Sequence, residues 1–319
     1  MSRHLVRRGW ILAITLLILL VLFFSLDPHR VLRTVADADV TILVGASLLT
    51  LLFPLLCAIR WKLIVRQLGV DMSLWDSFKL IMAAWPLGAV TPAKSGDLIK
   101  ILFLRNVMPY AQTTGVILAE RLVDVIALCL YAAVWGWIYR FPGAVWMALI
   151  ILAGVILFLL LAASRLVRLL PLRYRDFAVH ALSASTRMCL NLRSFSAILF
   201  VSFLNWFLSF TQTWLCYRAL HAEVPLTYIM AVLPIAIFIG LVPITLSGMG
   251  TRDSAVIVLF QNYAPSETSL SVGILYSIFG YWILSLLGIP FMRSAFTGAI
   301  GGVSGSELSR VIYDPPHDS

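Results

Sequence analysis

The chain has 319 residues, of which 61% are hydrophobic and only 12% are charged. A soluble domain normally carries about twice that share of charged residues. It could not hide so much apolar surface from water, whereas a bilayer takes it up as solvent. The composition therefore predicts an all-α polytopic membrane protein. The net charge of +9 is spread along the chain. With no aromatic-flanked basic patch outside the apolar segments, nucleic-acid binding is not expected.

Six apolar runs are long enough to cross the hydrocarbon core as helices, which takes about 20 residues. They cover residues 10–26, 40–59, 113–139, 143–163, 195–217 and 270–291. The first run follows Arg3, Arg7 and Arg8, as a signal peptide would, but no small-x-small cleavage site comes after it. We therefore interpret it as a retained transmembrane helix.

Two further apolar stretches, 77–104 and 226–262, are interrupted by prolines and glycines next to charged residues. Such irregular backbone survives at membrane depth only where protein or a water-filled cavity surrounds it. We interpret both stretches as broken helical hairpins that enter the membrane and turn back.

The two hairpins belong to an internal repeat. Residues 66–74 pair with 218–226, and after a four-residue gap 81–86 pair with 229–234. Each copy then reaches a Pro, a Gly and an Asp, which are Pro92, Gly96 and Asp97 in the first copy and Pro243, Gly248 and Asp253 in the second. The alternative is chance similarity between apolar segments. A true repeat gives halves at about 40–139 and 195–291 within a transmembrane domain covering 1–303, followed by a polar tail, 304–319.

Lys and Arg collect in cytoplasmic loops, and their distribution orients the chain. Arg60, Lys62 and Arg66 follow the second span, and the loop 164–194 holds six arginines. Placing both on the cytoplasmic side puts both termini there and the loop around Glu223 outside. The two copies of the repeat then face opposite sides, and inverted repeats with broken helices are typical of secondary transporters. We expect a multi-pass protein of a bacterial inner membrane.

Three charged residues, Glu120, Arg121 and Asp124, lie inside the span 113–139. Each costs on the order of 2.5–3.5 kcal/mol at the centre of a membrane helix. Glu120 and Asp124 share a helix face because they are four residues apart. The group therefore forms either a buried ion network that holds helices together or a polar cavity for an ion or a lipid headgroup.

The two hairpin turns, Lys94–Asp97 and Thr251–Asp253, each precede a short apolar stretch. Ser95 and Thr251 are the expected N-caps. Helix N-termini suit phosphate, and Lys94 and Arg252 add cations beside them. The alternative is that both turns are ordinary caps whose basic side chains extend to the interface.

No catalytic arrangement of Ser, His, Cys and acidic residues is present, and no Cys-x-x-Cys or His-x-x-x-His pair suggests a metal. Asp37-Ala38-Asp39 resembles the acidic pair that membrane glycosyltransferases use for a metal, although a solvated loop also explains it. We predict no enzyme activity, no metal and no cofactor.

The charged positions resemble those of the flippase-like transmembrane domain that precedes the synthetase domain in lysylphosphatidylglycerol synthases. The resemblance covers about 40–290 and rests on Arg60-Trp61-Lys62, Gly96-Asp97, Glu120-Arg121-x-x-Asp124 and Gly248-x-Gly250-x-Arg252-Asp253. Ser247 and Asp253 stand where that family usually has Gly and Glu. With no synthetase domain after it, the chain is not expected to transfer amino acids. The resemblance implies movement of a polar-headgroup lipid between leaflets.

These observations predict a lipid transporter or flippase for a phosphate-bearing lipid. The alternatives are a lipid-dependent membrane glycosyltransferase, or an accessory to one, and a non-catalytic scaffold. The partners are a membrane lipid and the bilayer, with a homo-oligomer possible. The predicted substrate-binding residues are Lys94, Asp97, Glu120, Arg121, Asp124, Arg252 and Asp253.

Overall fold

A computed structural model describes residues 15–18, 20–22, 28–91, 95–105, 107–164 and 191–296, together with the single positions 175, 179, 181 and 182. Within these residues the chain is helical and has no strand. Several predicted features lie outside the described residues. They are Lys94, most of the first span 10–26, most of the loop 164–194 and the tail 304–319.

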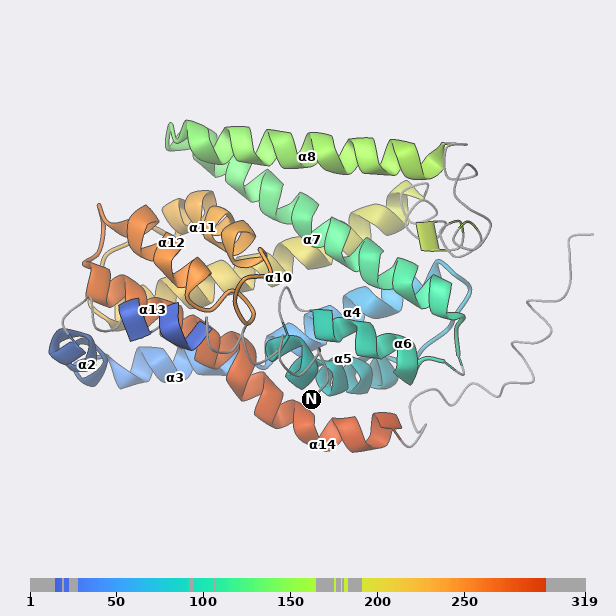
Figure 1. Ribbon diagram of the computed structural model, residues 1–319, viewed down its shortest axis with the longest axis horizontal. Coiled ribbons are helices and arrows are strands. Elements are labelled where there is room, and N and C mark those ends of the chain that lie inside the picture. Colours follow the sequence, from blue (N-terminus) through green and yellow to red (C-terminus); the bar gives the residue numbers. More distant parts are fainter. Residues whose placement is uncertain are drawn as a thin grey trace, which may run out of the picture.

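Helices stand where the apolar runs predicted spans (Figure 1). Helices α3 (Val40–Leu49) and α4 (Leu52–Arg66) occupy the second span, and α7 (Tyr110–Ile138), α8 (Pro142–Ala163) and α10 (Leu192–Ala219) follow. A short helix, α2 (Pro28–Ala36), precedes them, between the first two predicted spans. Among the described residues, four segments are long and apolar enough to cross a membrane: Val40–Arg66, Pro142–Ala162, Leu192–Ala219 and Ser266–Met292. The expected count of six spans stays a prediction.

The sequence analysis predicted that the second span ends at residue 59, but its helix is longer. Helix α4 continues to Arg66, so Arg60 and Lys62 lie within it. Arg60 does not belong to a loop, because it lies inside α4, and its side chain is buried. The end of this span was predicted too early because it was placed by hydropathy. In the sequence, a buried arginine that is paired inside the protein cannot be distinguished from an arginine in a loop. The topology thus loses Arg60 as a marker of the cytoplasmic side.

Each interrupted stretch forms a long helix, a break and a shorter helix that packs back on the first. The first hairpin consists of α5 (Leu74–Ala89), η1 (Ser95–Leu98) and α6 (Ile99–Phe103). The second consists of α11 (Leu226–Gly240) and α12 (Thr251–Phe260). The long helices start at Leu74 and Leu226, which the repeat had paired. The repeat and the inversion of one copy relative to the other both stay predictions.

A glycine closes each hairpin at the position that the repeat had paired. A side chain on Gly96 would collide with the backbone carbonyl of Leu87, near the end of α5. Gly248 has φ +78°, and a Cβ there would lie 2.7 Å from the carbonyl oxygen of Gly240. Only glycine combines a positive φ with so close a backbone approach at little cost.

The two hairpins meet at their breaks. Ser247 donates hydrogen bonds from its Oγ to the carbonyl oxygens of Ala89 at 2.8 Å and Gly88 at 3.2 Å. These carbonyls lie at the end of α5, where the helical ladder stops, and the Gly88 carbonyl also accepts from Oγ1 of Thr91 at 3.3 Å. Ser247 therefore joins the two hairpins directly.

The last helical segment links the two halves of the molecule (Figure 1). It runs through α13 (Ser266–Ser277), the π-helical turn η3 (Ile278–Ile283) and α14 (Leu284–Phe296). Helix α13 packs on α12, and α14 packs on α5. Buried apolar residues form one large cluster around α10 to α13 and a second around α4 to α7.

Replacing Gly248 by Ala tests the closure of the second hairpin. We expect Gly248→Ala to lower the stability by about 1–3 kcal/mol, because the residue holds a strained φ against Gly240. Gly154→Ala on α8 is the control, since nothing lies within 4 Å of its added Cβ. Thermal unfolding in detergent measures both. Equal midpoints for the two variants would show that the hairpin tolerates a side chain at its break.

Candidate functional site

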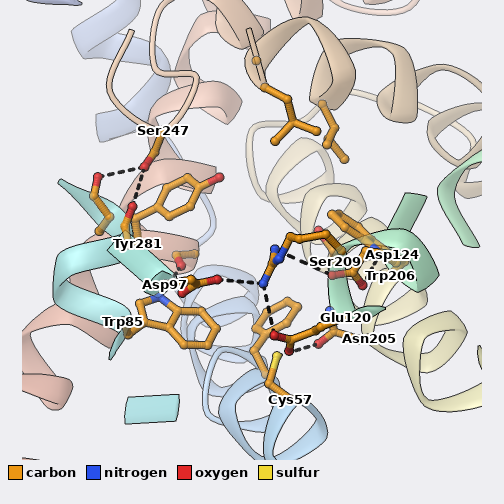
Figure 2. Close-up of a pocket in the computed structure, with 18 of the residues that line it drawn as sticks. Cys57, Trp85, Asp97, Glu120, Asp124, Asn205, Trp206, Ser209, Ser247 and Tyr281 are labelled. Carbon is orange, nitrogen blue, oxygen red and sulfur yellow. Dashed lines mark hydrogen bonds and ion pairs between the residues drawn. The ribbon is translucent and has the colours of Figure 1, made fainter. Parts of the chain in front are cut away.

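A cavity of about 390 Å³ lies between the two hairpins and the helices α4, α7 and α10. Its lining combines apolar side chains with charged residues from four segments of the chain: Arg60, Asp97, Lys100, Glu120, Arg121, Asp124 and Arg252. Figure 2 shows Asp97 and Trp85 on one side of this cavity and Glu120, Asp124 and Trp206 on the other. The break of each hairpin also reaches it, through Gly88 and Ser247.

Helix α7 carries the acidic side of the site. Its 29 residues span roughly 43 Å at 1.5 Å per residue, and Asp124 is the middle residue of Tyr110–Ile138. Glu120 and Asp124 are both buried, on the helix face that the sequence predicted them to share. Two carboxylates at this depth are stable only with cations beside them.

Arg60 on α4 is the cation that joins both carboxylates. Its Nη2 donates to Oε1 of Glu120 at 2.9 Å, and its Nη1 contacts Oδ1 of Asp124 and donates to Oγ of Ser202 at 3.0 Å. Trp206 adds a hydrogen bond from its indole Nε1 to Asp124 at 3.1 Å. The planar guanidinium thus ties α4 to α7 and α10 through fixed, directional bonds.

Lys100 and Arg121 complete the network on the side of the first hairpin. Lys100 places its Nζ 3.1 Å from Oε2 of Glu120 and 4.7 Å from the centre of the Trp61 ring. Arg121 donates from Nη2 to Oδ2 of Asp97 at 2.8 Å, which connects α7 to η1. Its Nη1 also lies 3.8 Å from Asp124.

The network contains equal numbers of positive and negative groups. Arg60, Lys100 and Arg121 face Asp97, Glu120 and Asp124. Such balance lowers the cost of keeping the groups out of water, but removal of one partner leaves a buried charge uncompensated. Groups of this kind can form ion pairs and hydrogen bonds with a charged or polar ligand. None of the described His, Cys, Asp and Glu residues cluster in the threes that a metal site needs.

A second, smaller ion pair lies at the start of α12. Arg252 donates from Nε to Oδ1 of Asp253 at 3.0 Å, and from Nη2 to the Gly273 carbonyl at 3.0 Å and to Ser277 Oγ at 2.8 Å. Its guanidinium lies 4.3 Å from the Tyr276 ring centre. Oδ2 of Asp253 accepts from the backbone N–H of Gly250 at 3.0 Å. Asp253 thus accepts from Nε and Nη2 of Arg252, the residue that the sequence analysis placed beside a phosphate. Within the Arg252 guanidinium, Nη1 has no hydrogen-bond partner.

A family model described as the lysylphosphatidylglycerol synthase TM region matches residues 10–288. The chain belongs to this family. Three archaeal UPF0104 membrane proteins are similar to it along most of their length. The one from Archaeoglobus fulgidus is 26% identical, covering 88% of this chain and 91% of its own. Those from Methanothermobacter thermautotrophicus and Methanocaldococcus jannaschii are 23% and 20% identical, and cover 89% and 87% of this chain and 95% and 92% of their own. The family resemblance is thereby confirmed.

The predicted site residues of this lysylphosphatidylglycerol synthase-like protein gather largely in one place. Asp97, Glu120, Arg121 and Asp124 form the main network, and Arg252 lines the same cavity. The Asp253 carboxylate binds Arg252 and the backbone N–H of Gly250, and thereby stabilises the turn before α12. Lys94 is outside the described residues. That these residues bind a substrate stays a prediction.

Neither expected N-cap, Ser95 or Thr251, holds that position. Ser95 is the first residue of η1, and the N-cap of α6 is Leu98. The N-cap of α12 is Gly250 at φ +91°, not Thr251, which is already the first helical residue. Asp39, one half of the acidic pair, caps α3: its Oδ1 accepts from the backbone N–H groups of Thr41 at 2.9 Å and Ile42 at 3.2 Å. The carboxylate of Asp39 therefore has a structural role.

Arg60, Lys100 and Trp206 are the cavity residues that the sequence analysis missed as site residues. Arg60 was part of the family motif but was counted as a loop charge. Lys100 stands three residues after Asp97, inside an apolar stretch. A lone charged residue in such a stretch could have identified it as a site residue. Trp206 carried no signal, because tryptophan in an apolar helix is common.

Glu120→Gln and Asp97→Asn each replace a carboxylate of the network by its amide. Together they test whether the loss of stability increases with the burial of the ion pair. We expect Glu120→Gln to lower the stability by about 3–5 kcal/mol, because it leaves Arg60 and Lys100 buried with less compensation. Asp97→Asn should cost about 1 kcal/mol or less, since its partner Arg121 is 39% exposed. Thermal unfolding in detergent compares the two variants. An equal loss in both would contradict the assignment of Glu120 as the buried centre.

Proposed function

We propose that this protein is a lipid transporter or flippase of a bacterial inner membrane, which moves a lipid with a phosphate-bearing headgroup between leaflets. The observation that carries the proposal is the charged cavity between the two broken hairpins. In a chain of apolar helices, a polar cavity gives a headgroup a path while the acyl tails stay in lipid.

The broken hairpins support a transport function. Discontinuous helices around a site near the midplane are the typical construction of secondary transporters, and both breaks reach this cavity. The hairpins join each other through the Ser247 hydroxyl and a small apolar cluster that contains Ala89 and Met249. Contacts of this kind can form and break during alternating access.

The cations of the cavity support a phosphate-bearing headgroup. Arg121 lines the cavity with a side chain that is 39% exposed, and Arg252 keeps its Nη1 without a hydrogen-bond partner. Guanidinium groups grip phosphate through parallel hydrogen bonds. The carboxylates of Asp97 and Asp124 would limit the net charge of the occupied site.

The glycosyltransferase alternative has less support from the geometry. It depended on Asp37 and Asp39 as metal ligands, and the Asp39 carboxylate caps α3. A scaffold that uses the charged network only to hold helices together is the remaining alternative, and transport measurements separate it from a flippase.

Replacing Arg121 by Gln tests the proposed function. The purified protein is placed in liposomes, and the movement of a fluorescent phosphatidylglycerol is compared with that of a phosphate-free diacylglycerol glycoside. We expect Arg121→Gln to slow movement of the phosphate lipid by at least about tenfold, because one charge-assisted contact is lost. Arg218→Gln is the matched control, since Arg218 pairs at the surface with Glu223 and does not line the cavity.

Two results would contradict the proposal. Wild-type protein that moves neither lipid faster than empty liposomes would favour the scaffold. Equal rates for Arg121→Gln and Arg218→Gln would show that the cavity does not handle the headgroup.

A further inference from the structure

The ion pair between Arg121 and Asp97 has different surroundings from the rest of the charged network. The side chains of Arg121 and Asp97 are 39% and 15% exposed, whereas those of Arg60, Glu120 and Lys100 are at most 3% exposed. Both partners line the cavity. A headgroup in the cavity therefore reaches this pair without disturbing the buried bonds of Arg60.

Asp97 has a second cation close by. Lys100 places its Nζ 4.0 Å from the same Oδ2 that accepts from Arg121 at 2.8 Å. If Asp97 releases Arg121, its charge stays compensated, because Lys100 is one turn away on the same hairpin. Without this neighbour, the release would leave an uncompensated carboxylate in a low-dielectric site.

Arg121 has unused hydrogen-bonding capacity. Its Nε is buried and has no hydrogen-bond partner. Its Nη2 is 2.8 Å from Asp97 and 3.6 Å from Glu120. A guanidinium can pair Nε and one Nη with two oxygens of a single anion, and Asp97 uses only one oxygen here.

We propose that Asp97 is an internal competitor for the headgroup phosphate. Its carboxylate occupies Nη2 of Arg121, which is one of the two donors that the non-bridging oxygens of a lipid phosphodiester would take, and it moves to Lys100 when that phosphate binds. The inference rests on the proposed function and names Arg121 as its phosphate receptor. No bond to carbon or phosphorus is made or broken in this exchange.

The exchange also links binding to movement. The Arg121–Asp97 pair is a direct connection between α7 and η1 of the first hairpin. When phosphate replaces Asp97, this connection opens, while Ser247 continues to hold the second hairpin to the first. Headgroup binding then opens the link between η1 and α7, while the Lys100–Glu120 pair still joins α6 to α7. Occupancy is thereby coupled to a local movement of η1, which a transporter can extend to a change of access.

Binding measurements on an Asp97→Asn variant test the competitor. Dihexanoyl phosphatidylglycerol is titrated calorimetrically into the full-length protein in dodecyl maltoside micelles, which contain no phosphate. We expect Asp97→Asn to bind it about tenfold more tightly than wild type, because the competing carboxylate is gone. Asp76→Asn is the matched control: it makes the same change of charge beside Lys79, outside the cavity, and should leave the affinity unchanged.

Further variants and probes separate the competitor from simpler effects. Adding Arg121→Gln to Asp97→Asn should abolish the gain, and Asp97→Ala should reproduce it if the amide variant fails to fold. Dihexanoylglycerol, which lacks phosphate, should not bind more tightly to any variant. Inorganic phosphate that gains as much affinity as the lipid would assign the receptor to the free anion and overturn the lipid part of the proposal.

The outcomes distinguish this inference from the function on which it rests. Unchanged or weaker binding by Asp97→Asn, together with binding by wild type, would overturn the competitor and leave the flippase standing. Absence of phosphatidylglycerol binding in every form, together with absence of lipid movement in liposomes, would overturn both.

Discussion

The pairing of one buried guanidinium with two buried carboxylates underlies the rest of this structure. Arg60 contacts Glu120 and Asp124 at the middle of α7, and Ser202 and Trp206 supply neutral hydrogen bonds from α10. None of these charges is stable alone in an apolar interior, so each requires the others. Three helices are thereby held at fixed positions around a space that apolar packing alone would close.

The remaining features follow from keeping that space open. Lys100 and Asp97 extend the charge pairing onto the first hairpin, and Ser247 ties the second hairpin to the first. Each hairpin can turn at this depth because a glycine allows its backbone arms to approach closely. The charged side chains differ in exposure: Arg60 is buried, whereas Arg121 is partly exposed. The contacts of Arg60 therefore hold the helices together, and those of Arg121 are within reach of a headgroup.

Much of this fold could be predicted from the sequence. Apolar runs located the long helices, and the repeat paired both the starts of α5 and α11 and the glycines at the hairpin breaks. The partners in the cavity could not be predicted, because Arg60 and Glu120 are 60 residues apart and hydropathy cannot distinguish a buried, paired arginine from one in a loop. The cap of α12 was misplaced by one residue because Gly250 adopts a positive φ that lets Asp253 reach back to its N–H group.

The central claim is that lipid headgroups enter the cavity between the hairpins. It is tested most directly by photo-crosslinking in liposomes, with a phosphatidylglycerol that carries a diazirine on its headgroup and with mass spectrometry to locate the adducts. We expect adducts on cavity-lining parts of α7 and α10, around Arg121 and Trp206. Adducts restricted to outward-facing residues such as Trp146 on α8 would place the headgroup at the surface only and contradict it.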